Sequence, residues 1–351
     1  MSGGPNGGRE DARETHRRVI VADMHAHPLL PMSFAGRDPA RRGRPPVLWN
    51  PLRQHWDLPR ALEGGVDIQV WTIYVPVRPV RRLPPIEETF RQIRLFERFV
   101  ARNSDQVAAA RTVGEARGIV EGGRMAFLLA IEGAHALGGS IGSLEELARL
   151  GLTYVTLVHF VPNGVCDSSD VPWRGAAPLT DLGKRLIREM DRLGILVDTA
   201  HTSDDAFREI ARVARGPLVC THTGCRALCP IRRNIPDDAI REVAATGGIV
   251  GIIAFPWYLS RRGVVVGIDR MVDHVAHIAQ LVGVDHVGIG TDFDGMIWTV
   301  QGLRDVSELP NLTAALLSRG FSGEEVERIL GGNFLRVLEN VESRRRELAC
   351  A

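Results

Sequence analysis

The chain has 351 residues, of which 44% are hydrophobic and 24% charged, so its composition is that of a globular protein with a sizeable core. Its 43 Lys and Arg residues nearly balance its 42 Asp and Glu residues, and the formal net charge is +1. This balance excludes a protein that binds nucleic acid or a membrane surface through an overall basic field.

Targeting signals and disulfides are not evident in the sequence. Residues 1–18 lack the apolar segment of a signal peptide, and no apolar run reaches the roughly 18 residues of a membrane span. We therefore expect a cytoplasmic protein with no membrane partner. The 5 cysteines are odd in number and irregular in spacing, which favours reduced thiols over a secreted disulfide framework.

Short β-branched apolar runs alternate along the chain with segments of helical periodicity. Before them, residues 1–17 are Gly-rich and charged and predict a flexible N-terminal arm. The predicted strands are residues 19–23, 66–75, 125–131, 152–158, 195–199, 217–221, 248–254 and 286–290. The predicted helices include residues 86–102, 143–150, 181–193, 204–214, 236–245 and 269–282. Ser143 with Glu146, and Ser322 with Glu325, have the spacing of capping boxes.

Apolar strands joined by helical crossovers indicate a parallel sheet that is covered on both faces. Eight such strands predict an α/β fold, a (β/α)8 TIM barrel. We expect a single catalytic domain over residues 18–345, with loop insertions at about 29–50 and 77–85 and a C-terminal tail at 346–351. Residues 66–75 also fit an edge strand.

Metal-ligating residue types follow the predicted strands at the end where a TIM barrel forms its active site. Of the 11 histidines, 5 lie at these exits, together with a glutamate and an aspartate. The residues are His25, His27, Glu132, His159, His201, His222 and Asp292. Because residues i and i+2 of a strand face the same side, His25 and His27 can reach one ion together. The joint pattern predicts a metal site at the barrel mouth.

The number of ligands favours two ions over one. Glu132 lies between two histidine pairs and can bridge ions about 3.5 to 4 Å apart, with a hydroxide between them. Imidazole and carboxylate ligands favour Zn²⁺ over Ca²⁺ or Mg²⁺. Asp292, beside the metals, can take the proton of the nucleophile and pass it to a leaving amine.

Two residues are candidates for contacts with a substrate. His159, if it is not a ligand, can stabilise the oxyanion that forms at the attacked carbonyl. Arg233 follows His222 in the chain and can clamp a substrate carboxylate in a bidentate pair, unless it is an ordinary surface arginine.

At these residues the sequence resembles the membrane (renal) dipeptidase family, a branch of the amidohydrolase superfamily of metal-dependent barrels. The resemblance covers roughly residues 19–342. It includes WDLPR at 56–60, QVW at 69–71, YVP at 74–76, IEG at 131–133, DTAH at 198–201, RNIPD at 233–237, GIGTDFDG at 288–295 and ILGGNFLR at 329–336. It implies a metal-dependent hydrolase barrel that acts as a binuclear zinc dipeptidase.

The resemblance also implies a role for each ligand of the two ions. Glu132 is the bridging ligand, His25 and position 27 hold the first ion, and His201 and His222 hold the second.

For the substrate, the resemblance implies that Asp292 shuttles the proton and that His159 contacts the reacting carbonyl. Arg233 then binds the dipeptide carboxylate, and Tyr74, in a matching stretch, is a further substrate-binding candidate.

One departure from the family pattern concerns the first strand. Family members read His-x-Asp there, whereas this chain has His25-Ala-His27. Imidazole in place of carboxylate removes one negative charge, which leaves the metals stronger Lewis acids or the first ion less tightly held. The alternative function is therefore hydrolysis of another amide, such as an N-acyl amino acid, a lactam or a biosynthetic intermediate. A catalytically silent metal-binding barrel is a third alternative, against which the presence of Glu132 and Asp292 argues.

Several further expectations complete the prediction. The side chains of the substrate would be read by residues 29–50 and 77–85 and by Phe255-Pro-Trp257-Tyr258. Cysteines 220, 225 and 229 are interpreted as buried or loop thiols and not as a zinc cluster. His274 and His277 are expected to face solvent or a subunit contact, and Asp198 and Asp294 to orient histidines. We expect a bacterial-type homologue without a membrane anchor; a homodimer is common among such barrels.

Overall fold

The computed structural model describes residues 5–44, 54–77, 83–261 and 265–350. A parallel sheet in the order β1-β2-β4-β5-β6-β7-β8-β9 forms its centre, and β3 pairs with β4 beside this path. The strands are β1 (Ala22–Ala26), β2 (Ile68–Tyr74), β3 (Val107–Ala109), β4 (Met125–Glu132), β5 (Leu152–Thr156), β6 (Leu196–Asp198), β7 (Leu218–Thr223), β8 (Ile249–Ile252) and β9 (Val287–Ile289).

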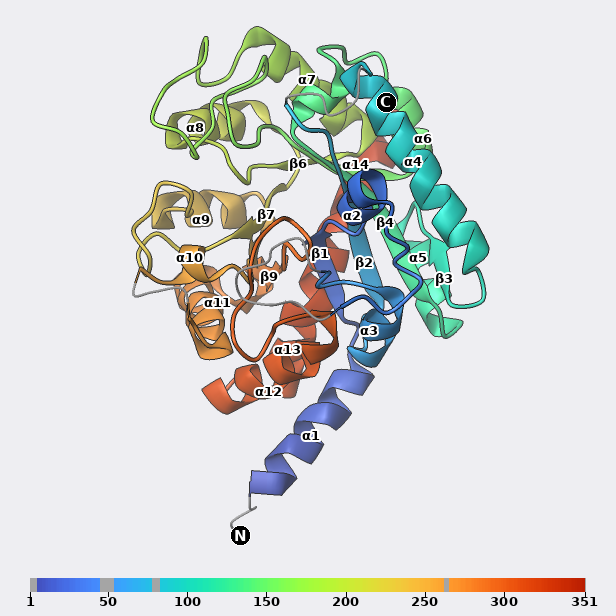
Figure 1. The fold of residues 1–351 in the computed structure, drawn as a ribbon. Coiled ribbons are helices and arrows are strands. Elements are labelled where there is room, and N and C mark those ends of the chain that lie inside the picture. The colour runs from blue at the N-terminus through green and yellow to red at the C-terminus, as the bar shows by residue number, and fades with distance from the viewer. Residues whose placement is uncertain (1–4, 45–53, 78–82, 262–264, 351) are drawn as a thin grey trace.

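Helices surround these strands, with α4 and α6 on one side and α8 to α11 on the other (Figure 1). They are α1 (Pro5–Arg18), α2 (Leu29–Ala35), α3 (Leu58–Glu63), α4 (Pro85–Arg102), α5 (Val113–Glu121), α6 (Leu144–Arg149), α7 (Asp181–Leu193), α8 (Asp204–Val213), α9 (Asp237–Ala245), α10 (Pro256–Leu259), α11 (Ile268–Val282), α12 (Leu309–Arg319), α13 (Gly323–Glu327) and α14 (Asn333–Cys350). None of the described helices is long and apolar enough to cross a membrane.

The sheet curves until its first strand meets the residues that follow its last. The Asp292 N–H donates to the His25 carbonyl at 2.9 Å, and the His27 N–H donates to the Phe293 carbonyl at 2.7 Å. Eight parallel strands therefore form a nearly closed barrel, which confirms the predicted (β/α)8 fold. Closure also brings the exits of β1 and β9 side by side.

The alternation of side chains along β4 shows how a strand positions the site. Phe127 packs outward against Trp71 of β2, with ring centroids 4.9 Å apart, and Trp71 in turn packs against Phe99 of α4 at 4.9 Å. Alternate residues of β4, such as Leu128, point to the other face of the strand and belong to a separate apolar cluster. Glu132 shares the phase of Leu128, so the strand directs it to the interior at the carboxyl end of the barrel.

One alternative and one prediction about local structure are wrong. Residues 66–75 do not form an edge strand, because β2 lies between β1 and β4 and is almost wholly buried. Ser143 does not cap α6: its backbone is helical, at φ −81° and ψ −11°, whereas a capping residue needs an extended backbone to turn its oxygen toward the free N–H groups. The capping box of Ser322 and Glu325 is confirmed at α13.

His274 does not face solvent. It is fully buried in α11, where Nδ1 accepts the Cys225 N–H at 2.8 Å and Nε2 donates to the Leu259 carbonyl at 3.0 Å. This side of the helix faces the barrel, and the imidazole bonds one peptide group that follows β7 and one at the end of α10. His277, one turn later, is half-buried and bonds Asp237 at 2.8 Å.

The N-terminal helix α1 packs its last turns on the barrel. His16 is buried, with Nδ1 2.6 Å from the Thr313 hydroxyl of α12 and Nε2 2.8 Å from the Gly64 carbonyl. The division into arm, single domain and tail stays a prediction. The two predicted loop insertions lie partly outside the described residues, which leave out 45–53 and 78–82.

Candidate metal centre and substrate pocket

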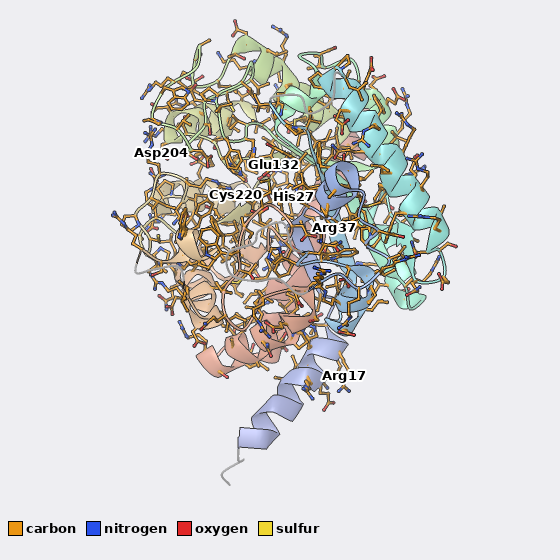
Figure 2. All side chains as sticks on the ribbon, viewed as in Figure 1. Arg17, His27, Arg37, Glu132, Asp204 and Cys220 are labelled. Carbon is orange, nitrogen blue, oxygen red and sulfur yellow. The ribbon has the colours of Figure 1, made fainter. Side chains whose placement is uncertain are left out.

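Four histidine side chains approach the carboxylate of Glu132 from β1 and from the ends of β6 and β7. His201 Nε2 and His222 Nε2 each lie 3.3 Å from Glu132 Oε1, and His25 Nε2 lies 3.5 Å from the same oxygen. His27 Nε2 lies 3.4 Å from Oε2. All five side chains are buried. His27 and Glu132 lie near the centre of the molecule (Figure 2).

Asp292 and His159 complete this group from the exits of β9 and β5. Asp292 Oδ1 is 3.3 Å from His27 Nε2 and 3.9 Å from His25 Nε2. His159 Nε2 is 3.5 Å from Glu132 Oε2. The structure thus brings together the seven residues that the strand exits indicated.

Hydrogen bonds on the far sides of the His25 and His222 imidazoles leave their Nε2 atoms free to bind a cation. His25 Nδ1 bonds the Tyr154 hydroxyl at 2.8 Å, and that hydroxyl donates to the Met24 carbonyl at 2.9 Å. His222 Nδ1 bonds the Thr221 hydroxyl at 2.9 Å, which donates to Asp198 at 2.8 Å. Each of these hydroxyls already donates its proton to another acceptor, so it can only accept a hydrogen bond from the histidine. The Nδ1 atom of each histidine must therefore carry the proton, and the lone pair on Nε2 points into the site.

The donor set fits a divalent metal such as zinc. His25 Nε2 and His27 Nε2 are 3.1 Å apart, and His201 Nε2 and His222 Nε2 are 3.0 Å apart. Two nitrogens at about 2.0 Å from one tetrahedral zinc would be separated by about 3.3 Å. Buried lone pairs that face each other this closely repel unless a cation lies between them.

Three overlapping groups of side chains have their donor atoms close enough to hold an ion. They are His25 with Glu132 and His222, His25 with His27 and Asp292, and Glu132 with His159 and His201. Glu132 belongs to two of these groups, as a bridging carboxylate would. None of the groups found among the described residues contains a cysteine, and cysteines 220, 225 and 229 are buried, in line with the interpretation as thiols.

Sequence reasoning missed Asp170, which lies in the long connection after β5. Its Oδ2 is 2.8 Å from His201 Nδ1 and 3.9 Å from Arg233 Nε. Arg233 Nε also lies 3.1 Å from His201 Nδ1. That nitrogen cannot both donate and accept, and donation to the nearer carboxylate frees Nε2 for a metal. No periodic pattern marks a loop carboxylate of this kind, so only the fold reveals it.

The two carboxylates expected to orient histidines differ in what they do. Asp198 acts through Thr221, as described above, and also accepts the Thr156 hydroxyl at 2.6 Å. Asp294 instead accepts the backbone N–H of His55 at 2.6 Å, so it supports a loop and not a candidate ligand.

The electrostatics of the site combine burial with close opposite charges. Burial would raise the pKa of Glu132, but the imidazoles around it, His159 first among them, hold that pKa well below its ordinary value. Burial lowers the pKa of His159 to about 3, against the opposing effect of Glu132, so its imidazole is neutral. Burial raises the pKa of Tyr74 to about 12, which keeps a phenol proton available for donation.

Two site residues have left-handed backbones that side chains rarely adopt. The φ angle is 66° at His201 and 60° at Asp292. Such strain gathers at functional sites because the surrounding structure must hold it in place. At Gly295, an added Cβ would lie 2.1 Å from Asp292 Oδ1, so only glycine leaves that carboxylate where it is.

A pocket of about 410 Å³ opens above these residues. Arg233 lies in its wall and is buried, which excludes the surface-arginine alternative. Its Nη2 donates to the His222 carbonyl at 2.9 Å, and its guanidinium lies 5.2 Å from the Tyr258 ring centroid. Tyr74, His159 and Asp292 line the same pocket.

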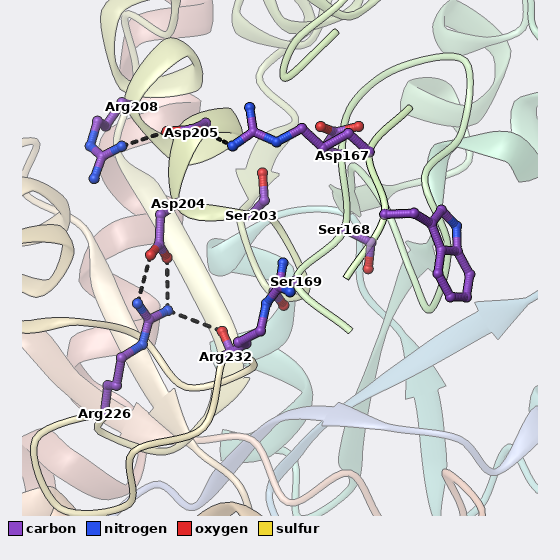
Figure 3. A pocket seen from close by; sticks show the side chains of 11 residues that line it. Asp167, Ser168, Ser169, Ser203, Asp204, Asp205, Arg208, Arg226 and Arg232 are labelled. Atoms are coloured by element: carbon purple, nitrogen blue, oxygen red, sulfur yellow. Dashed lines mark hydrogen bonds and ion pairs between the residues drawn. The ribbon is translucent and has the colours of Figure 1, made fainter. Parts of the chain in front are cut away.

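A second pocket of about 200 Å³ lies next to the first, between the loop that carries Asp167 and the start of α8 (Figure 3). Most of its charged side chains form ion pairs with one another. Arg226 forms a bidentate pair with Asp204 at 2.6 and 2.7 Å, and Asp205 pairs with Arg174 at 2.8 Å and Arg208 at 2.7 Å. These pairs tie together the loops on either side of His201.

Comparisons with known proteins agree on one family. The sequence profile described as membrane dipeptidase (Peptidase family M19) matches residues 9–350. The dipeptidase tcpJ of Claviceps purpurea (strain 20.1) is 37% identical over 300 residues, which is 83% of this chain and 70% of that protein. The dipeptidase aclJ of Aspergillus oryzae is 36% identical over 303 residues, 84% of this chain and 71% of that protein.

Solved structures agree with these matches. The probable dipeptidase PvdM from Pseudomonas aeruginosa has the same fold, with a TM-score of 0.86 at 24% identity over 97% of this chain and 100% of that one. A metallopeptidase from Rhodobacter sphaeroides, solved with a phosphinate mimic of the dipeptide L-Ala-D-Ala, has a TM-score of 0.82 at 27% identity over 92% of this chain and 99% of that one.

Proposed function

Because this chain belongs to the membrane dipeptidase family of metallopeptidases (Peptidase family M19), we propose that it hydrolyses the amide bond of a dipeptide or dipeptide-like substrate with a free C-terminal carboxylate. The observation that carries the proposal is the arrangement around Glu132. One buried carboxylate is surrounded by imidazole nitrogens within 3.5 Å, and a buried arginine lies in the wall of the same pocket. A hydrolase site for a small anionic amide needs both parts.

We assign two zinc ions to the site, shared through Glu132. His25 and His27 would hold the first, with Asp292 beside them, and His201 and His222 would hold the second. When bound, the zinc ions would polarise the substrate carbonyl and make water a nucleophile at neutral pH.

The protein's own groups would position the substrate and move its protons. Asp292, at the pocket edge, takes a proton from the attacking water and gives it to the leaving amine. His159, neutral and in the pocket wall, donates to the oxygen of the attacked carbonyl, with Tyr74 beside it at a ring distance of 5.0 Å. Arg233 pairs with the substrate carboxylate and so fixes the scissile bond over Glu132.

A panel of L,L and L,D dipeptides tests this function with zinc-loaded protein. Free amino acids should be released from some members of the panel, and Asp292→Asn should lower kcat by roughly 100-fold or more because the proton has no acceptor. Zinc-loaded wild type that leaves every dipeptide intact would refute the proposal.

A second candidate function is hydrolysis of another amide, and His27 is the observation that favours it. The imidazole lies 3.1 Å from His25 Nε2, at the position where the family has a carboxylate. His27→Asp restores that carboxylate. If dipeptidase activity is present only in this variant, the second candidate is correct; if the wild type is already active, it is excluded as the main function.

A further inference from the structure

The pocket above the metal centre has a polar floor and an aromatic wall. The floor consists of the histidines and carboxylates described above. The wall comes from the loops after β8 and β9 and contains Phe255, Trp257, Tyr258, Met296 and Trp298. These loops are neighbours because β8 pairs with β9 in the sheet.

The aromatic side chains of the wall support one another. Trp257 and Trp298 meet edge to face, with ring centroids 4.6 Å apart and an interplanar angle of 84°. Phe255 meets Trp298 in the same way, at 5.0 Å and 82°. Because the rings hold each other in place, the wall is already formed before any ligand binds.

Part of this wall is exposed, which is unfavourable for a large apolar surface that has no partner. Trp257 is 53% exposed and Met296 is 56% exposed. Phe160 also lines this pocket and is 50% exposed; its ring centroid lies 3.8 Å from that of His159, with the two rings tilted by 44°. Exposed apolar groups that converge on one cavity mark a surface that binds an apolar partner.

The wall is continuous with the groups that would hold the carboxylate and the reacting amide of a dipeptide. At one end, Phe255 contacts Tyr258 at 4.9 Å, and Tyr258 lies beneath Arg233. At the other end, Asp292 precedes the loop that leads to Trp298. A dipeptide whose carboxylate meets Arg233 and whose reacting amide lies near Asp292 therefore runs along the wall, and its side chains face aromatic rings.

We propose that the preferred substrates are dipeptides, or dipeptide-like amides, in which at least one side chain is large and aromatic or apolar and packs on Phe255, Trp257 and Trp298. This inference rests on the proposed function. When a dipeptide with small side chains binds, the aromatic wall stays in contact with water. When a dipeptide with an aromatic side chain binds, both that side chain and the exposed rings of the wall are removed from water, which favours binding. Charged side chains lose hydration there without gaining a partner.

The test compares kcat/KM for Ala-Ala, Ala-Phe and Phe-Ala in zinc-loaded protein. We expect one or both aromatic substrates to exceed Ala-Ala by about 10-fold or more. Trp257→Ala should reduce that ratio several-fold through a higher KM for the aromatic substrate, and Trp257→Phe should restore most of it. Trp173→Ala is the matched control, because Trp173 is 58% exposed but lines the neighbouring pocket.

The outcomes separate this inference from the function on which it rests. If Ala-Ala is cleaved as well as the aromatic substrates, or if Trp257→Ala leaves the ratio unchanged, the inference is wrong while the dipeptidase function stands. If zinc-loaded wild type cleaves none of the three dipeptides or the wider panel, the dipeptidase function itself fails.

Discussion

Asp170 offers a direct test of how the fold prepares a metal ligand. Its carboxylate is 2.8 Å from His201 Nδ1, and its side chain is 11% exposed. The contact with His201 and the charge of Arg233 lower the pKa of Asp170 against the effect of burial, so the group is ionised at neutral pH. Asp170→Asn keeps the shape of the side chain and removes only this charge.

The size of the effect follows from the hydrogen bond that changes. A hydrogen bond to a charged group contributes about 1.5 to 3 kcal/mol, and a neutral one contributes about half as much. Asp170→Asn should therefore cost about 0.75 to 1.5 kcal/mol at the ion that His201 holds, which is about a 4- to 12-fold weaker zinc affinity. Asp170→Ala leaves His201 Nδ1 facing Arg233 alone, and the loss should reach about 10- to 100-fold.

Competition with a zinc chelator measures this affinity without any substrate. Asp205→Asn is the matched control, because Asp205 is a nearby carboxylate that pairs with Arg174 and Arg208 and does not contact His201. The control should bind zinc like the wild type. The reasoning is refuted if Asp170→Asn retains wild-type affinity, or if Asp205→Asn loses as much.

Three further predictions concern the substrate, the metal and pH. Arg233→Lys replaces a planar guanidinium by a single ammonium charge and should raise KM for a dipeptide by about 10- to 100-fold, with a smaller change in kcat. Arg232→Lys is the control and should leave KM unchanged. Equal KM values for the two variants would contradict the proposed binding of the substrate carboxylate by Arg233. Removal of the metal should abolish turnover. It should also lower the free energy of unfolding by about 4 kcal/mol, compared with protein that holds zinc at a free concentration of 1,000 times the Kd. An unchanged melting temperature after removal would argue against a resident metal. Burial lowers the pKa of His274 from 6.5 to about 4 in the folded protein. As pH falls, the unfolded chain therefore protonates this imidazole before the folded chain does. The free energy of unfolding should decrease by up to about 3 kcal/mol between about pH 6.5 and pH 4. Denaturant unfolding at several pH values should show that the free energy of unfolding falls less steeply with decreasing pH in His274→Gln than in the wild type. Equal slopes in the two proteins would show that His274 does not contribute to this pH dependence.

Local pattern was sufficient to predict the eight strands of the barrel and the residues that leave them, although it missed the short β3 (Val107–Ala109). Each predicted strand has β-branched apolar residues, and six of the eight are followed by a histidine, a glutamate or an aspartate. Because the carboxyl ends of parallel strands share one end of a barrel, residues as far apart as His25 and Asp292 could be assigned to one site without coordinates. The helices that match within one residue, such as α7 at Asp181–Leu193, have equally clear periodicity.

Residues without a periodic context could not be predicted in this way. Asp170 lies in an irregular loop, and Trp298 follows a strand by several residues. Tyr154 occupies a strand position where an apolar side chain would fit the pattern equally well. His274 is different, because it lies on the apolar face of α11 with Met271 and Ile278, a spacing from which its burial could have been predicted.

The sequence by itself determined which elements form and which chemical groups stand at the ends of the strands, because both depend on residue types at fixed short spacings. The tertiary structure alone decided how those groups face one another. Closure of β1 on β9 places Asp292 against His27, loop packing buries Arg233 beneath the pocket, and adjacent loops join Phe255 to Trp298 in an aromatic wall. Those distances join residues remote in the chain, and they follow from how the whole barrel packs.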